Sequence, residues 1–406
     1  MIFRFCLYGF LKNQRYFEPF LVLVLMEKGL SFFAIGLLLG WRDLAVNLME
    51  IPSGALADGW GRRRSMILSF IAYIASFLLF GVARGAAPLV GAVTLYAVGD
   101  AFRTGTHKAM IFTWLRLQGR ESERTQVYGL TRSWSKVGSA VSSLIAAAFV
   151  LLGGSMAWVF YGAVLPYALG VVNFLGYPEA LEGEGRGQVR GRLTEVARLT
   201  LRSPELRGLI GESMGFEGVF EAVKEYLQPL LAVLAIALLA GMGVSALSDA
   251  QRAALLVGPV YFGLFLGSAA ASRQAHRFEA WMGSPERGAA ALWWGAIALY
   301  AVILLSLLGG LPALAVLGFA LLYVGQNLWR PALIGRMDLH TPPEHGAAVL
   351  SVESQARSLI SAVLAPLLGL AVDAAGGADG GLWPVAAVGL AVSVGFTLRR
   401  RRVPQS

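Results

Sequence analysis

Charged side chains occur inside the apolar runs of this chain, at positions where they could bind ions or carry protons. The first apolar run, near the N-terminus, contains Lys12, Arg15 and Glu18. If that run crosses a membrane, each charge near its centre costs about 2.5–3.5 kcal/mol, whereas a Leu or Val recovers only about 0.3–0.6 kcal/mol. These groups therefore have to line a protein interior or a water-filled cavity, where charged residues mark routes for ions and solutes.

Polar and charged side chains also recur at helical spacing in later runs. Residues that are three, four or seven positions apart lie on one face of a helix. The stripes formed in this way are Asp43, Asn47 and Glu50; Asp100, Arg103 and His107; Arg132 and Lys136; Glu217, Glu221, Lys224 and Gln228; Gln326, Asn327 and Arg330; and Glu353 and Arg357. Their cations can hold a charged solute and their carboxylates can accept a proton. Each stripe has a structural alternative, because acidic groups beside cations inside lipid equally form permanent ion pairs.

The composition of the chain indicates that lipid surrounds these runs. Of its 406 residues, 56% are hydrophobic and 15% are charged, and the mean hydropathy is +0.62. Soluble domains carry about 25% charged residues. The single cysteine, Cys6, excludes a disulfide framework and a thiolate metal site. No paired metal-ligand motif and no phosphate-binding glycine loop occurs in the sequence. We therefore expect that the protein is not an enzyme and that it binds neither a metal nor a cofactor.

A helix that spans a bilayer needs about 20 mostly apolar residues. That window predicts twelve spans, at 5–26, 32–57, 64–82, 88–115, 126–152, 155–175, 206–240, 252–272, 288–309, 311–334, 346–373 and 381–399. One long polar break, the linker 176–205, separates an N-terminal six-helix bundle (1–175) from a C-terminal one (206–406). We expect a short amphipathic helix around Leu193–Leu201 in the linker, and a kinked or re-entrant piece after Pro229 in the seventh span.

Basic residues collect in alternate loops, and this asymmetry sets the orientation of a membrane protein. With the N-terminus inside, the cytoplasmic loops and the C-terminal tail hold most arginines, whereas the opposite loops offer little beyond Lys28, Arg84 and Arg252. We therefore predict that both termini are cytoplasmic, in a bacterial inner membrane. The formal net charge of +9 is explained by these loops, so we expect no nucleic-acid partner. No small-residue cleavage site follows the first run, which argues against a signal peptide.

A turn with a charge cluster separates the second and third predicted spans. Gly54, Asp58, Gly61, Arg62 and Arg63 follow the spacing Gly-x3-Asp-x2-Gly-Arg-Arg. This spacing resembles the motif in the loop between the second and third helices of the major facilitator superfamily. The preceding run, Glu50-Ile-Pro-Ser-Gly54, resembles a bacterial subgroup of that family with a Glu-Ile-Pro-Ser/Thr-Gly second helix.

The resemblance implies an all-α membrane protein with twelve transmembrane helices in two pseudo-symmetric six-helix bundles. It also implies a secondary transporter that works by alternating access, with the loop motif as a gate in which Asp58 faces the start of the eleventh helix. A duplicated unit should repeat residues at equivalent positions. The fourth and tenth spans do so with Tyr96, Asp100 and Arg103, and with Tyr323, Asn327 and Arg330.

The stripes and the resemblance together give the predicted site residues. Substrate contacts are expected, between the two halves, from Arg15, Tyr16, Arg103, His107, Gln326, Asn327 and Arg330. Proton coupling is expected from Glu18, Asp43, Asp100, Glu217 and Glu221. His107 titrates near neutral pH, although a hydrogen-bonded bystander is an equal alternative. The stripes at Arg132 and Lys136 and at Glu353 and Arg357 lie toward the ends of their runs, where snorkelling or structural ion pairing is an alternative to substrate contact.

We therefore expect a transporter of a small polar, charged or zwitterionic solute that is coupled to protons, or to sodium, and acts as a monomer in the lipid bilayer. One rival is a drug/proton antiporter that exports lipophilic compounds and uses aromatic walls such as Trp134 and Trp329. The fifth span lacks the glycine-proline motif of those antiporters, and Arg103-Thr-Gly-Thr-His107 replaces the family's Arg-x2-Gln-Gly motif in the fourth. The other rival is a non-transporting membrane sensor or scaffold.

Overall fold

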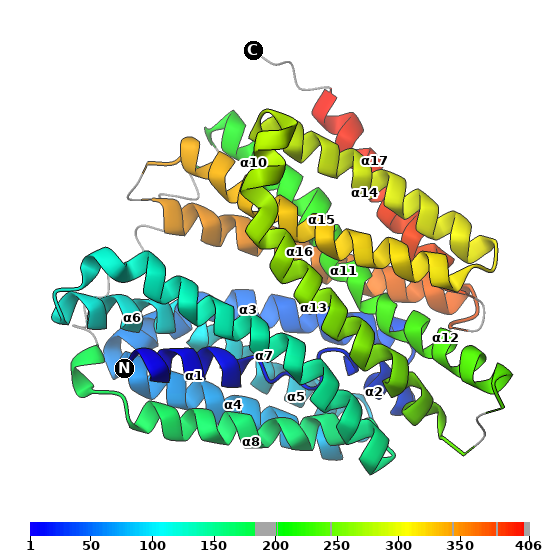
Figure 1. Cartoon of the computed structure of the whole chain (residues 1–406), viewed down its shortest axis with the longest axis horizontal. Coiled ribbons are helices and arrows are strands. Elements are labelled where there is room, and N and C mark those ends of the chain that lie inside the picture. The colour runs from blue at the N-terminus through cyan, green and yellow to red at the C-terminus, as the bar shows by residue number, and fades with distance from the viewer. Residues whose placement is uncertain (183–199, 201, 244–245, 343–344, 379–380, 402–406) are drawn as a thin grey trace. The chain divides into compact units, whose positions relative to one another are not determined.

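The computed structural model of the chain describes residues 1–182, 200, 202–243, 246–342, 345–378 and 381–401. Within these residues every regular element is a helix (Figure 1). The expected all-α architecture is confirmed. The amphipathic helix expected around Leu193–Leu201 falls almost entirely on residues 183–199 and 201, which lie outside the described part of the chain.

The chain folds into two compact units, which are described here one at a time. Unit 1 comprises 1–29, 41–190 and 243–266, and unit 2 comprises 30–40, 191–242 and 267–406. Two long helices are divided between the units. Helix α3 (Phe32–Trp60) belongs to unit 2 up to Gly40, and α13 (Asp249–Met282) belongs to unit 1 up to Leu266.

Unit 1 is built on a layer of buried aromatic rings. Its helices are α1 (Ile2–Lys12), α2 (Leu21–Glu27), α4 (Arg62–Val82), α5 (Ala86–Arg103), α6 (Thr106–Leu117), α7 (Arg124–Gly153) and α8 (Trp158–Leu175), with short 3-10 turns at Glu121–Glu123 and Glu179–Leu181. Helix α4 packs against α5 and α8. The ring of Tyr167 on α8 lies 5.1 Å from Phe70 and 4.9 Å from Phe77 on α4. Ser76 on α4 donates a hydrogen bond to the carbonyl of Ala92 on α5 at 2.7 Å, so polar groups inside the bundle are paired.

Helices α1 and α7 of unit 1 pack closely because glycines face the contact on both of them. A side chain at Gly9 would lie 2.7 Å from the carbonyl oxygen of Thr131, and one at Gly138 would lie 2.7 Å from that of Phe10. Small residues let membrane helices approach in this way. The amide of Gln14 adds a hydrogen bond to the carbonyl of Gly138 at 3.2 Å.

Two predicted spans of unit 1 are broken in the structure, and those two predictions of continuous helices were wrong. The first, 5–26, is divided into α1 and α2, and residues 13–20 are not helical (Figure 1). Pro19 explains much of this, because it disfavours a helical residue before it and lacks an N–H. The fourth, 88–115, is divided into α5 and α6 at Thr104 and Gly105, where Gly105 has φ +76°. Glycine is the residue that reaches this backbone region without strain.

Unit 2 is a second helical bundle. Its elements are α10 (Pro204–Ser213), the π turn η3 (Met214–Gly218), α11 (Val219–Val223), the 3-10 turn η4 (Lys224–Tyr226), α12 (Leu227–Gly241), α14 (Pro285–Leu308), α15 (Pro312–Leu339), α16 (Gly346–Ala374) and α17 (Trp383–Arg401). The start of α3 is also part of this unit. Its first amides, Phe32 and Phe33, donate to the carboxylate of Asp373 on α16 at 3.0 and 2.8 Å.

The seventh predicted span runs as continuous helical backbone from Pro204 to Gly241, although its helix type changes along the way. Pro229, where a kink or a re-entrant piece was expected, lies in the first turn of α12, shortly after the 3-10 turn η4, and the helical backbone continues through it. The π turn η3 is the more telling irregularity, because single π turns in α-helices often occur at functional sites.

Nine helices in the described part of the chain are long and apolar enough to cross a membrane, judged by length and composition. A tenth apolar helix, Trp383–Thr397, is shorter. Helices α1, α2 and α6 are too short to meet these limits, and α5 is long enough but not apolar enough.

Candidate functional site

Unit 1 contains a partly open cavity of about 280 Å³ between α1, the α5–α6 break and α7. We call it the unit 1 pocket. It is lined by Tyr8, Gly9, Lys12, Asn13, Arg103, Gly105, His107, Lys108, Tyr128, Thr131, Arg132, Ser135, Lys136 and Ser139. Ligand pockets for drug-sized molecules usually hold about 300–1,000 Å³, so this cavity fits a small solute.

The charge of the unit 1 pocket has one sign. Its lining contains Lys12, Arg103, Lys108, Arg132 and Lys136, and it contains no carboxylate. Within the described part of the chain, only Arg103 of these five has an ion-pair partner. The ammonium of Lys108 instead lies 5.5 Å from the ring centres of Phe112 and Tyr128.

The two chain breaks and the α1–α7 contact position these cations. The close glycine contacts bring the end of α1, with Lys12 and Asn13, against the polar stripe of α7. The break at Gly105 places the N-terminus of α6 at the pocket wall, since Gly105, His107 and Lys108 all line it. The first amides of a helix lack partners inside the helix, and the helix dipole makes this end positive.

Asp100 and Arg103, which we call the α5 ion pair, neutralise each other beside the pocket. The guanidinium of Arg103 donates to Asp100 Oδ1 through Nη2, and through Nε at 3.2 Å. The hydroxyl of Tyr73 on α4 donates to the same carboxylate oxygen at 2.6 Å and accepts from Arg103 Nε at 3.1 Å. Asp100 therefore holds Arg103 in place at the edge of the pocket.

His107 is buried in an aromatic setting. Its ring stacks on Tyr8 at 3.7 Å between centroids, and its Nε2 lies 3.1 Å from the hydroxyl of Tyr177. Tyr177 follows α8 and also donates from its hydroxyl to the carbonyl of Arg4 at 3.2 Å. His107 therefore has aromatic and hydrogen-bonding neighbours and also lines the pocket, so both of its expected roles stay predictions.

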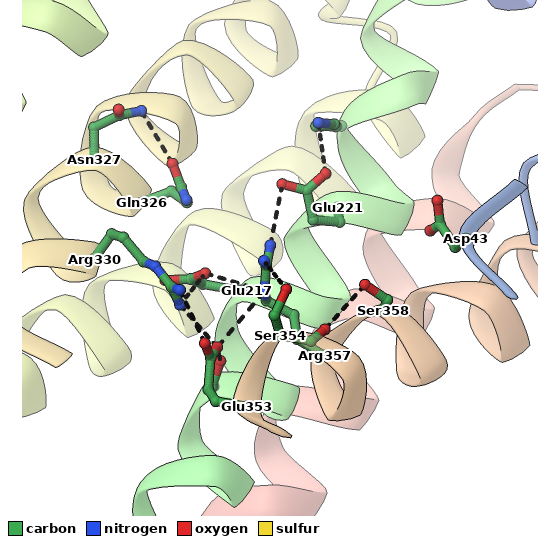
Figure 2. Close-up of polar contacts among 12 residues, drawn as sticks. Asp43, Glu217, Glu221, Gln326, Asn327, Arg330, Glu353, Ser354, Arg357 and Ser358 are labelled. Atoms are coloured by element: carbon green, nitrogen blue, oxygen red, sulfur yellow. Dashed lines mark hydrogen bonds and ion pairs between the residues drawn. The ribbon is translucent and has the colours of Figure 1, made fainter. Parts of the chain in front are cut away.

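Unit 2 contains a network of alternating charges, shown in Figure 2. Arg330 on α15 reaches two carboxylates with essentially no exposed surface, Glu353 on α16 at 2.7 and 2.9 Å and Glu217 in η3 at 3.0 Å. Arg357, one turn after Glu353, lies 3.6 Å from Glu353 and 3.5 Å from Glu217. Ser213 also donates a hydrogen bond to Glu353. We call these residues the unit 2 network.

The unit 2 network extends along the same helices. Glu221 pairs with Lys224 at 2.6 Å and approaches Arg357 at 3.9 Å. Oε1 of Glu217 is buried and has no hydrogen-bond partner in the described part of the chain. Glu217, Glu221 and Glu353 thus face Arg330, Arg357 and Lys224, and the network is close to neutral.

The loop motif is held by the segment that follows α8. Gly61 has φ +98°, which only glycine adopts readily, and it immediately precedes α4. The guanidinium of Arg63 donates to Glu182 at 3.2 Å and to the carbonyl of Tyr177 at 3.1 Å. Arg62 donates to the hydroxyl of Thr113 at 3.1 Å. The side chain of Asp58 lies outside the described part, so its expected contact with the eleventh helix stays a prediction.

The predicted substrate residues are distributed over both units. Arg103 and His107 line the unit 1 pocket, whereas Arg15 and Tyr16 lie in the non-helical stretch 13–20 and are not part of its lining. The ring of Tyr16 packs against Phe149 at 5.4 Å. In unit 2, Arg330 belongs to the network, and Asn327 donates to its neighbour Gln326 at 3.0 Å.

The predicted proton carriers also lie in several different surroundings. Glu217 and Glu221 belong to the unit 2 network, and Asp100 is held by Arg103 and Tyr73. Asp43 pairs with its neighbour Arg42 at 3.0 Å. Glu18 lies within the non-helical stretch 13–20 and is partly buried.

Sequence reasoning gave too little weight to five residues. Lys12, Arg132 and Lys136 carry much of the pocket's charge, and Glu353 and Arg357 complete the unit 2 network. The sequence of α7 contained a pattern that could have pointed to Arg132 and Lys136. Six of its polar residues recur at helical spacing and share one face: Tyr128, Thr131, Arg132, Ser135, Lys136 and Ser139.

Comparison with known proteins agrees with this picture. The family model described as Major Facilitator Superfamily matches residues 5–366. A relative described as "Uncharacterized MFS-type transporter YxaM", from Bacillus subtilis (strain 168), is 30% identical over 106 residues, which is 26% of each chain. The chain therefore matches about a quarter of that relative's length.

Solved structures share the fold over nearly the whole chain. The nucleoside transporter NupG has a TM-score of 0.72 at 12% identity and covers 98% of this chain and 97% of its own. A POT family transporter in complex with a thioalcohol-conjugated peptide has a TM-score of 0.69 at 13% identity, with 100% and 96% covered. A bacterial homologue of the human lysosomal transporter Spinster has a TM-score of 0.67 at 17% identity, with 99% and 96% covered. Identities this low establish a common fold.

The family match, the helices able to cross a membrane and the buried charge clusters lead to one assignment. The chain is a multi-pass membrane protein, and it belongs to the Major Facilitator Superfamily.

Proposed function

We propose that this transporter moves a small polar, charged or zwitterionic solute by alternating access and draws on the proton gradient. Its place is the bacterial inner membrane, with both termini cytoplasmic, and it acts as a monomer of the Glu-Ile-Pro-Ser/Thr-Gly subgroup. The observation that carries the proposal is the unit 1 pocket. Cations without ion-pair partners in the described part of the chain surround a cavity of about 280 Å³ inside a membrane-spanning bundle.

The pocket favours a charged solute over a lipophilic drug. Desolvating a cation inside a membrane is costly, so residues such as Lys12 and Lys136 require a hydrated or charged neighbour. The two tryptophans expected to form aromatic walls in a drug antiporter, Trp134 and Trp329, are not part of this pocket's lining. Trp329 is buried and stacks on Phe216 at 4.2 Å, and Trp134 contacts Phe10 at 6.2 Å; neither lines the cavity.

The unit 2 network supplies a candidate for proton coupling. Two buried carboxylates, Glu217 and Glu353, share Arg330, and like charges so close together oppose each other. A proton on the unpartnered Oε1 of Glu217 would remove that repulsion and weaken the hold on Arg330. Loading and release of this proton can therefore change how the helices that carry these residues are held.

The test is solute accumulation in proteoliposomes under an imposed pH gradient, screened over organic anions, amino acids and lipophilic cations. We expect Glu217→Gln to abolish accumulation driven by the gradient while exchange of labelled for unlabelled solute continues. Glu205→Gln, an exposed carboxylate on the same span, is the matched control and should leave accumulation intact. Normal gradient-driven accumulation by Glu217→Gln would contradict the coupling role.

The same screen separates the rivals. Efflux of ethidium from cells, together with uptake of lipophilic cations by proteoliposomes, would favour the drug antiporter. A sensor or scaffold predicts no flux of any solute, and no change in the accessibility of engineered cysteines when ligand is added.

A further inference from the structure

We infer that the unit 1 pocket binds a small dianion, a solute with two negative charges such as a phosphate monoester or a dicarboxylate. This inference rests on the proposed function, because the pocket is the solute site named there. It goes further by assigning the sign and the number of charges that the solute carries.

The first argument is the local charge balance. Lys12, Lys108, Arg132 and Lys136 have no ion-pair partner in the described part of the chain, and Arg103 is already neutralised by Asp100. Cations that share a small cavity repel one another, and an incoming dianion relieves this repulsion more than a monoanion does. A cationic solute would add to the repulsion.

The second argument is the direction of the backbone dipole at the pocket. The N-terminus of α6, a helix of 12 residues, opens on the cavity beside Gly105. Helix N-termini present free amide protons and favour anions such as phosphates and carboxylates. The amides here add to the cations of α1 and α7, so the donors converge from three segments.

The third argument concerns the hydroxyl groups of α7. The hydroxyl of Thr131 donates to the carbonyl of Tyr128 at 2.7 Å, and that of Ser135 donates to the carbonyl of Thr131 at 3.1 Å. Their protons are therefore in use, whereas their oxygens can still accept hydrogen bonds. A solute that carries hydroxyl groups beside its charges can donate to these oxygens, so a hydroxylated dianion fits best.

The unit 2 network provides an internal comparison. Its carboxylates Glu217, Glu221 and Glu353 balance Arg330, Arg357 and Lys224. A network whose charges balance in this way does not need a charged ligand to neutralise it. The lining of the unit 1 pocket, by contrast, contains four cations without an ion-pair partner in the described part of the chain, which assigns the anion to that pocket.

The test is equilibrium binding to the full-length protein in nanodiscs, by calorimetry at low ionic strength and with no ion gradient. The probes are malate and glycerol phosphate as dianions, lactate as a monoanion, glycerol as a neutral solute and putrescine as a dication. We expect both dianions, or the one whose shape the pocket accepts, to bind more tightly than the other three probes. Their Kd should rise with salt, because mobile ions screen charge.

Variants locate the binding. Lys136→Gln and Arg132→Gln should each raise the Kd of the better dianion by at least about tenfold, which is 1.4 kcal/mol. Arg124→Gln is the matched control on the same helix, because Arg124 is exposed and pairs with Glu121 at 2.8 Å. It should leave the Kd unchanged. Since the substitutions relieve repulsion, both pocket variants should unfold at temperatures no lower than the unsubstituted protein.

The inference is overturned if neither dianion binds, if putrescine or glycerol binds as tightly as the dianions, or if the pocket variants bind like the control. A monoanion that binds as well as the dianions overturns the assignment of two charges. Dianion binding without any flux in proteoliposomes would contradict the proposed transport but not the pocket's charge preference. Flux of a cation together with absent dianion binding would contradict this inference alone.

Discussion

Replacing Arg330 by methionine should destabilise the protein substantially, because this guanidinium is shared by two carboxylates that have essentially no exposed surface. Breaking a buried ion pair by removing one partner typically costs about 3–5 kcal/mol, since the other charge stays buried without compensation. Arg357 remains 3.5 and 3.6 Å from the two carboxylates and compensates in part. We therefore expect the free energy of unfolding to fall by about 3 kcal/mol, the lower end of that range.

The measurement is a denaturant titration of the purified protein in mixed micelles, arranged as a double-mutant cycle. Arg330→Met combined with Glu217→Gln should lose less than the sum of the single losses, with a coupling energy of at least about 1 kcal/mol. Arg124→Gln, which breaks an exposed pair, should cost about 0–1 kcal/mol. A cost for Arg330→Met no larger than that of this control, or a cycle without coupling, would refute the network as the element that holds these helices together.

Two further substitutions test how the unit 1 pocket is built. Tyr73→Phe removes a hydroxyl that is hydrogen-bonded to both members of the α5 ion pair, and it should lower the free energy of unfolding by about 1.5–3 kcal/mol. The control is Tyr300→Phe, which should be nearly neutral because the Tyr300 hydroxyl has no hydrogen-bond partner in the described part of the chain. Equal losses in the two variants would contradict the role of Tyr73. Gly138→Ala places a methyl group against the carbonyl of Phe10 and should cost about 1–3 kcal/mol in unfolding free energy. Gly129→Ala on the same helix meets nothing within 4 Å and should stabilise by about 0.5–1 kcal/mol, so a loss there would contradict the packing argument.

Much of the architecture could be predicted because lipid imposes a simple rule on sequence. Apolar runs of about 20 residues define spans, and the loop motif at Gly54–Arg63 led to the family that the comparisons show. The breaks at residues 13–20 and at Gly105 were missed, because hydropathy averages over a window and does not register a single backbone dihedral. A positive φ at one glycine is set by its packing partners and is invisible to a hydropathy window.

The candidate site could be predicted only in part, because spacing within one helix does not identify partners on another. The stripe of Glu217 and Glu221 was visible in the sequence, whereas its pairing with Glu353, Arg330 and Arg357 needed three helices to be brought together. Arg132 and Lys136 looked like residues near a span end. Their role at the pocket appeared only when the α1–α7 contact placed them beside Lys12.

The most direct measurement of a hydrated, positively charged pocket is the reactivity of a cysteine placed in it. In a background with Cys6→Ala, Ser139→Cys lies in the pocket lining, whereas Leu144→Cys replaces an exposed apolar side chain of the same helix that does not line the pocket. We predict that Ser139→Cys reacts with membrane-impermeant thiol reagents, faster with an anionic than with a cationic methanethiosulfonate, and that Leu144→Cys does not react. An unreactive Ser139→Cys, or a faster reaction with the cationic reagent, would show that no hydrated cationic pocket exists there.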